Sequence, residues 1–351
     1  MKRKLMVTVL AATLAFGLVA CGNAAGGETA PEEAAAEESA PAGEETPAEE
    51  APAKEEAEPA AEEGKTLKVA YIPNSMSNEM NAYGYKIMEE HQGDYNMEVT
   101  AFDGQYDSQT ETAAITNCIG QGYDALILCP SDINAVIPSV MQAKEAGIIV
   151  AMYSADLPEE YREYRDIFVG VDDTEAGKNA AKAFIDQFPD GAKVIEVGGT
   201  AGTDAQIRRH DGFNAGLEGS NIEVLDYQAT DSWSSNETMA ITEDMIVKYG
   251  DEIQGIFCHW DGGATGCIEA LKNAGIEGTY IVAIDGSRSG FDQVKDGTQN
   301  VCISQNVVNI SLKALEVIRN AADGKNFEAE NYVPLDMVTS DNVEELPYPE
   351  W

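Results

Sequence analysis

Arg208 and Arg209 stand side by side in a chain whose formal net charge is −40. A guanidinium group donates hydrogen bonds to two neighbouring oxygens at once, so an arginine at this place is suited to bind an oxygen-rich ligand. The two arginines can equally form solvated ion pairs with Asp204 or Asp211. Which alternative holds depends on where the surrounding elements place the side chains.

The arginines lie near the start of a helix that closes a predicted strand–loop–helix unit. Residues 194–197 form an apolar run of the length expected for a buried strand. The glycines within 198–202 predict a loop where the backbone bends sharply or approaches a ligand closely. Thr203 or Asp204 is suited to cap a helix over 205–217. Ligands of α/β sheets bind at the carboxyl ends of the strands, so this helix start is expected to face a crevice.

Short β-rich runs alternate with helical runs along the whole of residues 65–305. This alternation predicts parallel sheets with right-handed crossovers. The strands are too many for one compact sheet. We therefore expect an α/β fold of two similar Rossmann-like lobes. The expected strands are 67–72, 97–102, 125–129, 148–152, 168–171, 194–197, 223–227, 255–258, 280–284 and 301–304, and the clearest helices are 79–91, 108–121, 133–146, one from 174, 205–217, 234–249 and 265–274.

The two lobes are expected to share a hinge of three strands and to enclose a ligand cleft. The N-terminal lobe should comprise 65–169 and 306–333, and the C-terminal lobe 170–305 and 334–351. The chain should cross between lobes near Gly170, near Gln305 and again within 331–336.

Polar and aromatic side chains follow many of the predicted strands, where they would face this cleft. Amide, carboxylate and guanidinium groups can satisfy a polyhydroxylated ligand from all sides, and a tryptophan face can stack on a sugar ring. Asp285 can also cap its own turn, Trp233 can pack within a lobe, and Gln305 can serve the hinge backbone. The candidates are Asn74, Asn78, Asn81, Tyr153, Ser154, Arg209, Trp233, Trp260, Asp261, Asp285 and Gln305.

The chain begins with segments that are not expected to join the folded part. Residues 1–20 have a basic start, an apolar centre and small residues before Cys21, which is the order of a signal peptide. Residues 21–64 contain 14 glutamates and one lysine, with no aromatic or large aliphatic residue. Such a segment cannot form a core, so we expect an extended acidic tether.

The stretch GTAGTDAQIRRHDGF is similar to the corresponding loop of the type I periplasmic binding proteins, the ribose- and galactose-binding components of sugar ABC transporters. The resemblance covers most of residues 65–335. In that family the arginine matching Arg209 holds sugar hydroxyls. Residues 18–21 resemble the lipobox of bacterial lipoproteins, which implies that Cys21 carries a lipid anchor on the outer face of the cell membrane. The implied function is to bind a monosaccharide or polyol by hinge closure and to deliver it, as a monomer, to an ABC permease.

Other positions match the family's ligand contacts. Asn78 matches a hydrogen-bonding residue of the first loop, and Trp233 matches a ring-stacking aromatic. Asp285, within Ile-Asp-Gly, resembles the sugar-binding aspartate of the family's Phe-Asp-Gly. Gln305 matches a glutamine at a hinge crossing. Residues 171–177 resemble the start of the family's second lobe.

The sequence departs from the ribose binders at three places. Ser154 and Ala155 stand where ribose binders carry Asp-Arg, Met80 and Asn81 replace an aromatic pair, and Trp260 replaces an asparagine. Loss of the Asp-Arg pair removes charge-assisted hydrogen bonds to hydroxyls. The resemblance therefore implies the same fold and binding mode with a ligand other than ribose.

Several function classes are excluded or disfavoured. The acidic charge argues against nucleic acid as a partner. Neither the three scattered histidines nor the cysteines have metal-ligand spacing, so we expect no metal and no cofactor. The cysteines after Cys21 are expected to be buried thiols: Cys118, Cys129, Cys258, Cys267 and Cys302.

No catalytic motif or placeable pair of carboxylates predicts an enzyme, although a sugar-modifying enzyme remains a weaker alternative. A receptor for a signal molecule or nucleoside would use the same lobes and hinge, and only its partner would differ. A repressor of the related regulator family is disfavoured, because a signal segment and an acidic tether are expected where a DNA-binding helix-turn-helix would lie.

Overall fold

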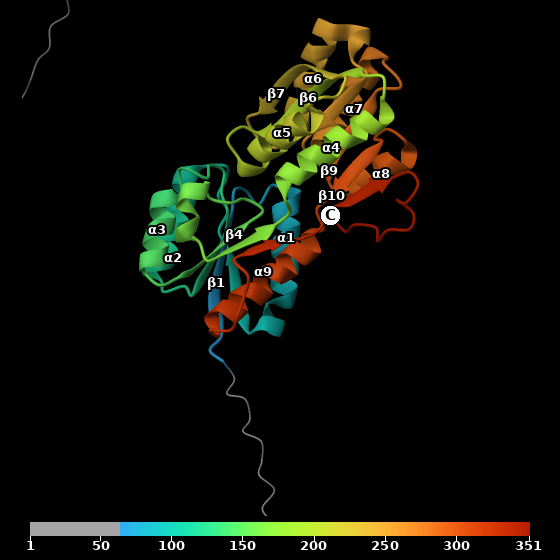
Figure 1. Ribbon diagram of the computed structural model, residues 1–351. Helices are drawn as coiled ribbons and strands as arrows, with labels where there is room; N and C mark the ends of the chain where they lie inside the picture. The colour runs from blue at the N-terminus through green and yellow to red at the C-terminus, as the bar shows by residue number, and fades with distance from the viewer. Residues whose placement is uncertain (1–63) are drawn as a thin grey trace, which may run out of the picture. The chain divides into compact units, whose positions relative to one another are not determined.

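The computed structural model describes residues 64–351, which form two six-stranded sheets, each covered by helices (Figure 1). The two-lobed α/β fold expected from the sequence is therefore confirmed. The expected signal segment, Cys21 and the tether up to residue 63 lie outside the described residues. None of the helices within residues 64–351 combines the length and the apolar character that crossing a membrane requires.

The first sheet has the strand order β11-β5-β4-β3-β1-β2, and all its neighbouring strands are parallel. Helices α1 and α9 cover one face of the sheet, and α2 and α3 cover the other (Figure 1). The strands are β1 (Leu67–Pro73), β2 (Met97–Ala101), β3 (Ala125–Cys129), β4 (Ile149–Tyr153), β5 (Ile167–Gly170) and β11 (Glu330–Tyr332), and the helices are α1 (Glu79–His91), α2 (Ser108–Gly120), α3 (Ile137–Glu145) and α9 (Val307–Ala322).

The second sheet repeats this arrangement in the order β12-β10-β9-β8-β6-β7, and only β12 is antiparallel to its neighbour. Helices α4 and α5 pack on one face, and α6 and α7 on the other. The strands are β6 (Ala192–Thr200), β7 (Ile222–Thr230), β8 (Gly255–Cys258), β9 (Tyr280–Asp285), β10 (Val301–Ser304) and β12 (Asp336–Thr339), and the helices are α4 (Asp173–Gln187), α5 (Asp204–Leu217), α6 (Ser235–Tyr249), α7 (Asp261–Ala274) and α8 (Arg288–Asp296).

The chain passes between the two lobes three times. It leaves the first sheet after β5, returns to the first lobe between β10 and α9, and crosses again between β11 and β12. Helix α9 packs against α1 and β4 of the first lobe, although it follows a strand of the second sheet. These crossings form the expected three-strand hinge.

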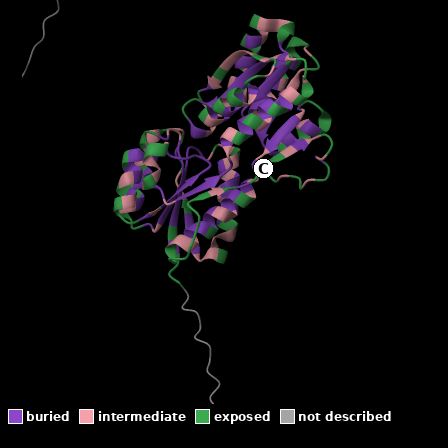
Figure 2. Ribbon diagram, viewed as in Figure 1, coloured by how far each residue is buried: buried purple, intermediate pink, exposed green. Residues whose placement is uncertain are grey.

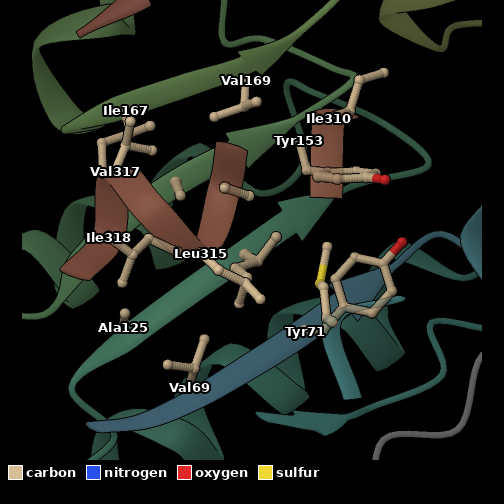
Figure 3. Packing of buried hydrophobic residues seen from close by; sticks show 14 of the residues in the cluster. Val69, Tyr71, Ala125, Tyr153, Ile167, Val169, Ile310, Leu315, Val317 and Ile318 are labelled. Atoms are coloured by element: carbon tan, nitrogen blue, oxygen red, sulfur yellow. The ribbon is translucent and has the colours of Figure 1, made fainter. Parts of the chain in front are cut away.

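Each sheet is buried on both faces, which explains why its strands are continuous apolar runs. Strand β3 (ALILC) is buried at every position and ends where Pro130 follows. Figure 3 shows one face, where Val69 and Ala125 of the sheet meet Leu315 and Ile318 of α9. The helices bury only the side that faces a sheet and expose the other (Figure 2).

A polar side chain caps the first helix of each lobe. The Asn78 side chain accepts a hydrogen bond from the Asn81 N–H at the start of α1. Asp172 accepts from the Thr174 and Glu175 N–H groups at the start of α4. Such caps satisfy donors that the first helical turn leaves unpaired.

Two local expectations were wrong. The helix expected over 133–146 begins only at Ile137, because Asp132 Oδ1 accepts from the backbone N–H groups of Asn134 and Ala135 and holds a turn there. Strand β6 does not end at residue 197 but continues to Thr200 beside β7. The first two glycines of the expected loop, Gly198 and Gly199, are therefore strand residues.

Candidate ligand-binding site

A pocket lies between the two lobes, at the carboxyl ends of the strands of both sheets. The first lobe contributes the loop after β1 and the ends of β3 and β4. The second lobe contributes the start of α5, the loop after β7 and the ends of β8 and β9. This is the place where open α/β sheets bind ligands.

Three asparagines form the first-lobe wall through a connected hydrogen-bond network. Asn81 Nδ2 donates to Asn74 Oδ1 at 2.7 Å, and Asn81 Oδ1 accepts from Tyr71 Oη at 3.1 Å. Asn78 uses its side-chain oxygen to cap α1. Asn81 therefore uses its side-chain amide to hold Asn74 in place. All three asparagines line the pocket.

The second-lobe wall is built around Arg209, which is almost completely buried. Its Nε donates to Asp173 Oδ1 at 2.7 Å, and its Nη1 donates to the His259 carbonyl oxygen. The guanidinium carbon lies 5.8 Å from the centre of the Trp233 ring, within cation–π range. These contacts fix the plane of the guanidinium, and no hydrogen bond joins its Nη2 group to another described residue.

Two tryptophans add a rigid aromatic surface. The rings of Trp233 and Trp260 meet edge to face with centroids 5.0 Å apart. Trp233 lies over Gly199, where a Cβ atom would come within 2.1 Å of the ring. Glycine in this strand therefore makes room for the aromatic wall, which is the close approach that glycine permits.

Asp285 and Gln305 close the pocket on the hinge side. Gln305 Nε2 donates to Asp285 Oδ1 at 2.6 Å. Burial raises the pKa of Asp285 to about 8, although the nearby Arg209 charge opposes this. The pocket therefore combines an arginine paired with Asp173 and a carboxyl that burial drives toward its neutral form. Because neither group leaves an unbalanced charge in the pocket, an uncharged ligand is favoured.

Two buried polar atoms of the pocket lining have no hydrogen-bond partner among the described residues. They are Ser154 Oγ and Gln305 Oε1. A buried polar atom without a partner costs about 1–3 kcal/mol. Hydroxyl groups of a ligand would supply the missing partners, since a hydroxyl both donates and accepts.

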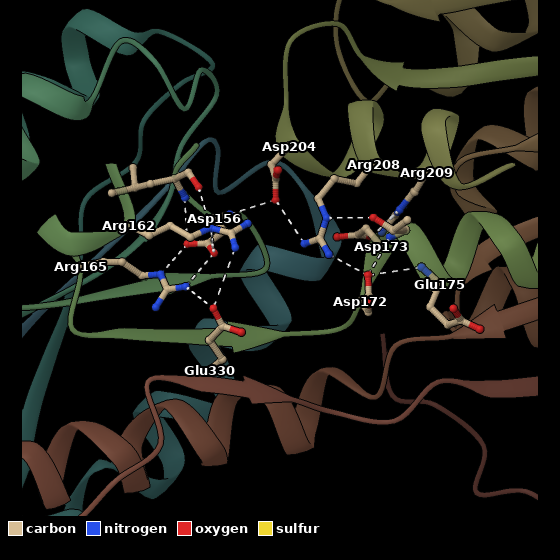
Figure 4. A network of polar contacts seen from close by, with 12 residues as sticks. Asp156, Arg162, Arg165, Asp172, Asp173, Glu175, Asp204, Arg208, Arg209 and Glu330 are labelled. Atoms are coloured by element: carbon tan, nitrogen blue, oxygen red, sulfur yellow. Dashed lines mark hydrogen bonds and ion pairs between the residues drawn. The ribbon is translucent and has the colours of Figure 1, made fainter. Parts of the chain in front are cut away.

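A network of charged residues joins the lobes beside the pocket (Figure 4). In the first lobe, Arg165 binds Asp156 through two hydrogen bonds of 2.6 and 2.9 Å. The Asp156 N–H donates across the cleft to Asp204 Oδ2 at 2.9 Å. Arg208 donates to Asp172 Oδ1 at 2.7 Å, so this arginine serves the hinge whereas Arg209 faces the pocket.

Nine of the eleven candidate residues line the pocket: Asn74, Asn78, Asn81, Ser154, Arg209, Trp233, Trp260, Asp285 and Gln305. Tyr153 does not, because its ring packs in the core against Tyr71 and its hydroxyl bonds Ser311 Oγ at 2.9 Å. Asp261 is also absent from the lining. It is fully buried and accepts hydrogen bonds from the Gly286 and Ser287 N–H groups.

The sequence reasoning missed several lining residues. Thr203 and Asp204 are expected from the sequence to cap a helix, and Asp204 also to pair with an arginine, but both stand at the cleft. Thr203 does occupy the N-cap of α5, but its hydroxyl donates to Thr200 O rather than capping. The rule that loops after parallel strands face the cleft would have found these residues and the Cys129–Pro130 end of β3. The remaining missed residues are Met80, Ala155 and Ala205.

The cysteines of the described residues are free and buried, as expected. His259, between Cys258 and Trp260, bonds Glu196 Oε1 at 2.9 Å deep in the second lobe. His259, Trp260 and Asp261 therefore point to three different surroundings and do not form a common site.

The chain is similar to known binding proteins in sequence and in structure. A family model described as periplasmic binding protein domain matches residues 69–326. The ribose import binding protein of Bacillus subtilis is 28% identical over 69% of this chain and 77% of its own length. The xylitol-binding protein of Mycolicibacterium smegmatis is 27% identical over 71% of this chain and 70% of its own length.

Solved structures show the same fold. A galactofuranose-binding protein superposes with a TM-score of 0.75 at 21% identity, covering 80% of this chain and 96% of that one. An ABC transporter solute-binding protein of Bacillus halodurans with bound myo-inositol gives a TM-score of 0.74 at 24% identity, covering 80% and 97%. Fold, cleft and family model agree: this chain belongs to the family of periplasmic binding proteins and is a binding protein rather than an enzyme.

Proposed function

We propose that the protein binds a small neutral polyhydroxylated ligand, a monosaccharide or polyol other than ribose, and delivers it to an ABC permease. The observation that carries this proposal is the pair of unpartnered buried atoms, Ser154 Oγ and Gln305 Oε1, in a cleft with aromatic walls and a fixed arginine. Relatives whose names state ribose or xylitol, and neighbours solved with myo-inositol or D-allose, support the ligand class.

The proposed roles follow from the contacts of each side chain. Arg209 donates to ligand oxygens, and Trp233 and Trp260 stack on the ring or carbon face. Asp285, Gln305 and Ser154 exchange hydrogen bonds with hydroxyls. Asn78 and Asn81 complete the first-lobe wall, Asn81 chiefly by orienting Asn74.

Ligand contacts on both lobes would favour the closed arrangement, because a ligand shifts a conformational equilibrium only by its differential affinity for the two states. We take the N-terminal lobe as 65–169 with 306–333 and the C-terminal lobe as 170–305 with 334–351. The membership of the strands in the two sheets supports these bounds.

We further propose that Cys21 is lipidated and that residues 21–64 tether a monomeric binding domain outside the membrane. The lipobox-like residues 18–21 support this anchor. Labelling cells with a radioactive fatty acid tests it. The wild-type protein should carry label and sediment with membranes, whereas Cys21→Ser should do neither; a labelled Cys21→Ser protein would contradict the assignment.

Thermal unfolding against a ligand panel tests the binding function. The protein is stripped of ligand by unfolding and refolding, then heated with monosaccharides, polyols, nucleosides and amino acids. A ligand at about a hundred times its dissociation constant adds about 2.7 kcal/mol of stability. We expect a shift with sugars or polyols; a shift only with nucleosides or amino acids would contradict the ligand class.

The two adjacent arginines supply a matched pair of variants. Arg209→Lys loses the planar fork that holds Asp173 and His259, so the affinity for the shifting ligand should fall by about tenfold or more. Arg208→Lys alters an ion pair at the hinge and should change the affinity far less. Equal losses in the two variants would contradict the assignment of Arg209 to the pocket.

A further inference from the structure

The last residues of the sequence pass from the second lobe to the first. Figure 1 shows this end of the chain near β10 and α1, which belong to different lobes. The segment follows β12 of the second sheet, and its last residue packs against a helix of the first lobe. It forms a connection in addition to the three hinge crossings.

The segment is attached to the second lobe through apolar, polar and backbone contacts. Val343 and Leu346 pack into a cluster with Phe291 of α8. Tyr348 Oη donates to the Asp292 carboxylate at 3.0 Å. The Arg288 N–H donates to the Trp351 carbonyl oxygen at 2.6 Å, which holds the backbone of the last residue on the second lobe.

The side chains of the final residues lie against α1 of the first lobe. The rings of Trp351 and Tyr83 are stacked, with centroids 6.2 Å apart and an interplanar angle of 15°. Lys86 Nζ lies 3.5 Å from Glu350 Oε2. The ion pair is exposed and contributes little, so the aromatic contact provides most of the attraction between the lobes here.

Trp351 also borders the ligand cleft. A chamber beside the main pocket is lined by Trp351 and Ser287, and it shares Trp233, Trp260 and Asp285 with that pocket. Separation of the lobes would break the Trp351–Tyr83 stack and open this chamber. Closure of the lobes would re-form the stack and close the chamber again.

We propose that residues 346–351 are a strap between the lobes and that Trp351 is a positioning residue that slows ligand release. The strap holds the closed lobes together at the edge of the cleft. The strap must detach from α1 before a ligand can leave or enter, so loss of the strap should speed dissociation and should not slow association. This inference rests on the proposed function of hinge closure around a ligand.

Stopped-flow tryptophan fluorescence with xylitol, myo-inositol and D-allose as probes tests the strap. In Trp351→Ala and in Tyr83→Ala, the dissociation rate should rise about three- to tenfold, the factor expected for one lost aromatic pair. The association rate should stay unchanged or rise, because the ligand-free protein also has to break the stack in order to open. Phe327→Ala, which removes a partly exposed aromatic of the first lobe away from the strap, serves as the control and should leave both rates unchanged.

A double-mutant cycle in urea unfolding of the ligand-free protein gives a second measurement. If the stack joins the lobes, the double variant Trp351→Ala/Tyr83→Ala should lose less stability than the two single losses added together. Additive losses, or unchanged dissociation rates, would overturn the strap. Wild-type protein that binds none of the probes would count against the proposed ligand class, and the cycle would still decide whether the strap joins the lobes.

Discussion

Asp285 carries two unfavourable features at the centre of the ligand pocket. Its backbone adopts φ 138°, a conformation that residues other than glycine rarely take, and the residue is buried, with 9% of its surface exposed. Burial raises its pKa to about 8, so the ligand-free folded protein holds a proton that the unfolded chain releases above about 4. Strain of about 1–3 kcal/mol of this kind persists where function requires it.

We predict that Asp285→Asn weakens ligand binding and stabilises the ligand-free protein at neutral pH. The folded pKa of Asp285 lies above its unfolded value, so its contribution to stability is fully present below pH 4 and is lost as the pH rises through about 8. An asparagine side chain does not ionise, so the variant should not lose this stability as the pH rises. Urea unfolding from pH 5 to pH 9 should show a flatter pH dependence and a gain of about 1 kcal/mol or more above pH 8.

Asp341→Asn is the matched control, because Asp341 is an exposed aspartate of the same lobe. It should leave the pH dependence of unfolding as in the wild type. If Asp285→Asn kept the wild-type slope, the carboxyl would not be protonated in the folded protein, and the neutral-pocket argument would lose its main support.

At the scale of elements, α4 and α5 position the paired charges of the pocket by packing backbone against backbone. A Cβ on Gly177 of α4 would lie 2.2 Å from the Arg209 carbonyl oxygen, and a Cβ on Gly212 of α5 would lie 2.1 Å from the Thr174 carbonyl oxygen. Only glycine allows this approach. The close packing sets the 2.7 Å contact between Asp173 on one helix and Arg209 on the other.

We therefore predict that Gly212→Ala reduces both stability and ligand affinity. The added methyl group would collide with the backbone of α4 and force the two helices apart. The free energy of unfolding should fall by about 1–3 kcal/mol. Gly120→Ala, in a helix with open space around the glycine, should be neutral or slightly stabilising. Urea unfolding and ligand calorimetry measure both. A neutral Gly212→Ala would show that the helix pair can relax without cost.

Most elements could be predicted from their hydrophobic patterns. Strands buried on both faces are continuous apolar runs, and helices buried on one side repeat apolar residues every three or four positions. The exceptions have local causes that such patterns do not contain. Residues 133–136 are apolar enough for a helix, yet the Asp132 turn delays α3 to Ile137. Gly198 and Gly199 resemble a loop in sequence, yet pairing with β7 keeps them in the sheet.

At the scale of the whole molecule, the two lobes place equivalent strand ends at the cleft. Strands β4 and β9 hold the same place in the two sheet orders. Ser154 follows β4 with φ 51°, Asp285 ends β9 with φ 138°, and both line the pocket. The repeat of strand ends is what made the site predictable from sequence. It could not distinguish Ser154 from Tyr153, because successive residues point to opposite sides and the sequence does not say which one faces the core and which one the cleft.

The closed arrangement of the lobes should respond to pH through Asp204, which accepts the Asp156 N–H across the cleft. Burial raises the pKa of Asp204 to about 6, while that hydrogen bond and Arg208 oppose the rise. Opening returns the carboxyl to water and toward its ordinary pKa of 3.8, so closure takes up a proton and is favoured as the pH falls through about 6.

We predict that affinity for a sugar or polyol identified by thermal shift tightens between pH 7.5 and pH 5, and that Asp204→Asn reduces this tightening. The asparagine oxygen can still accept the Asp156 N–H but cannot titrate, so the pH step near 6, about two- to tenfold, should disappear. Asp211→Asn removes an exposed carboxylate from the same helix and should preserve the step. Calorimetric titration at three pH values measures it. An equal step in Asp204→Asn would mean that closure takes up its proton elsewhere, with Asp285 as the remaining buried carboxyl of the pocket whose pKa lies well above its ordinary value.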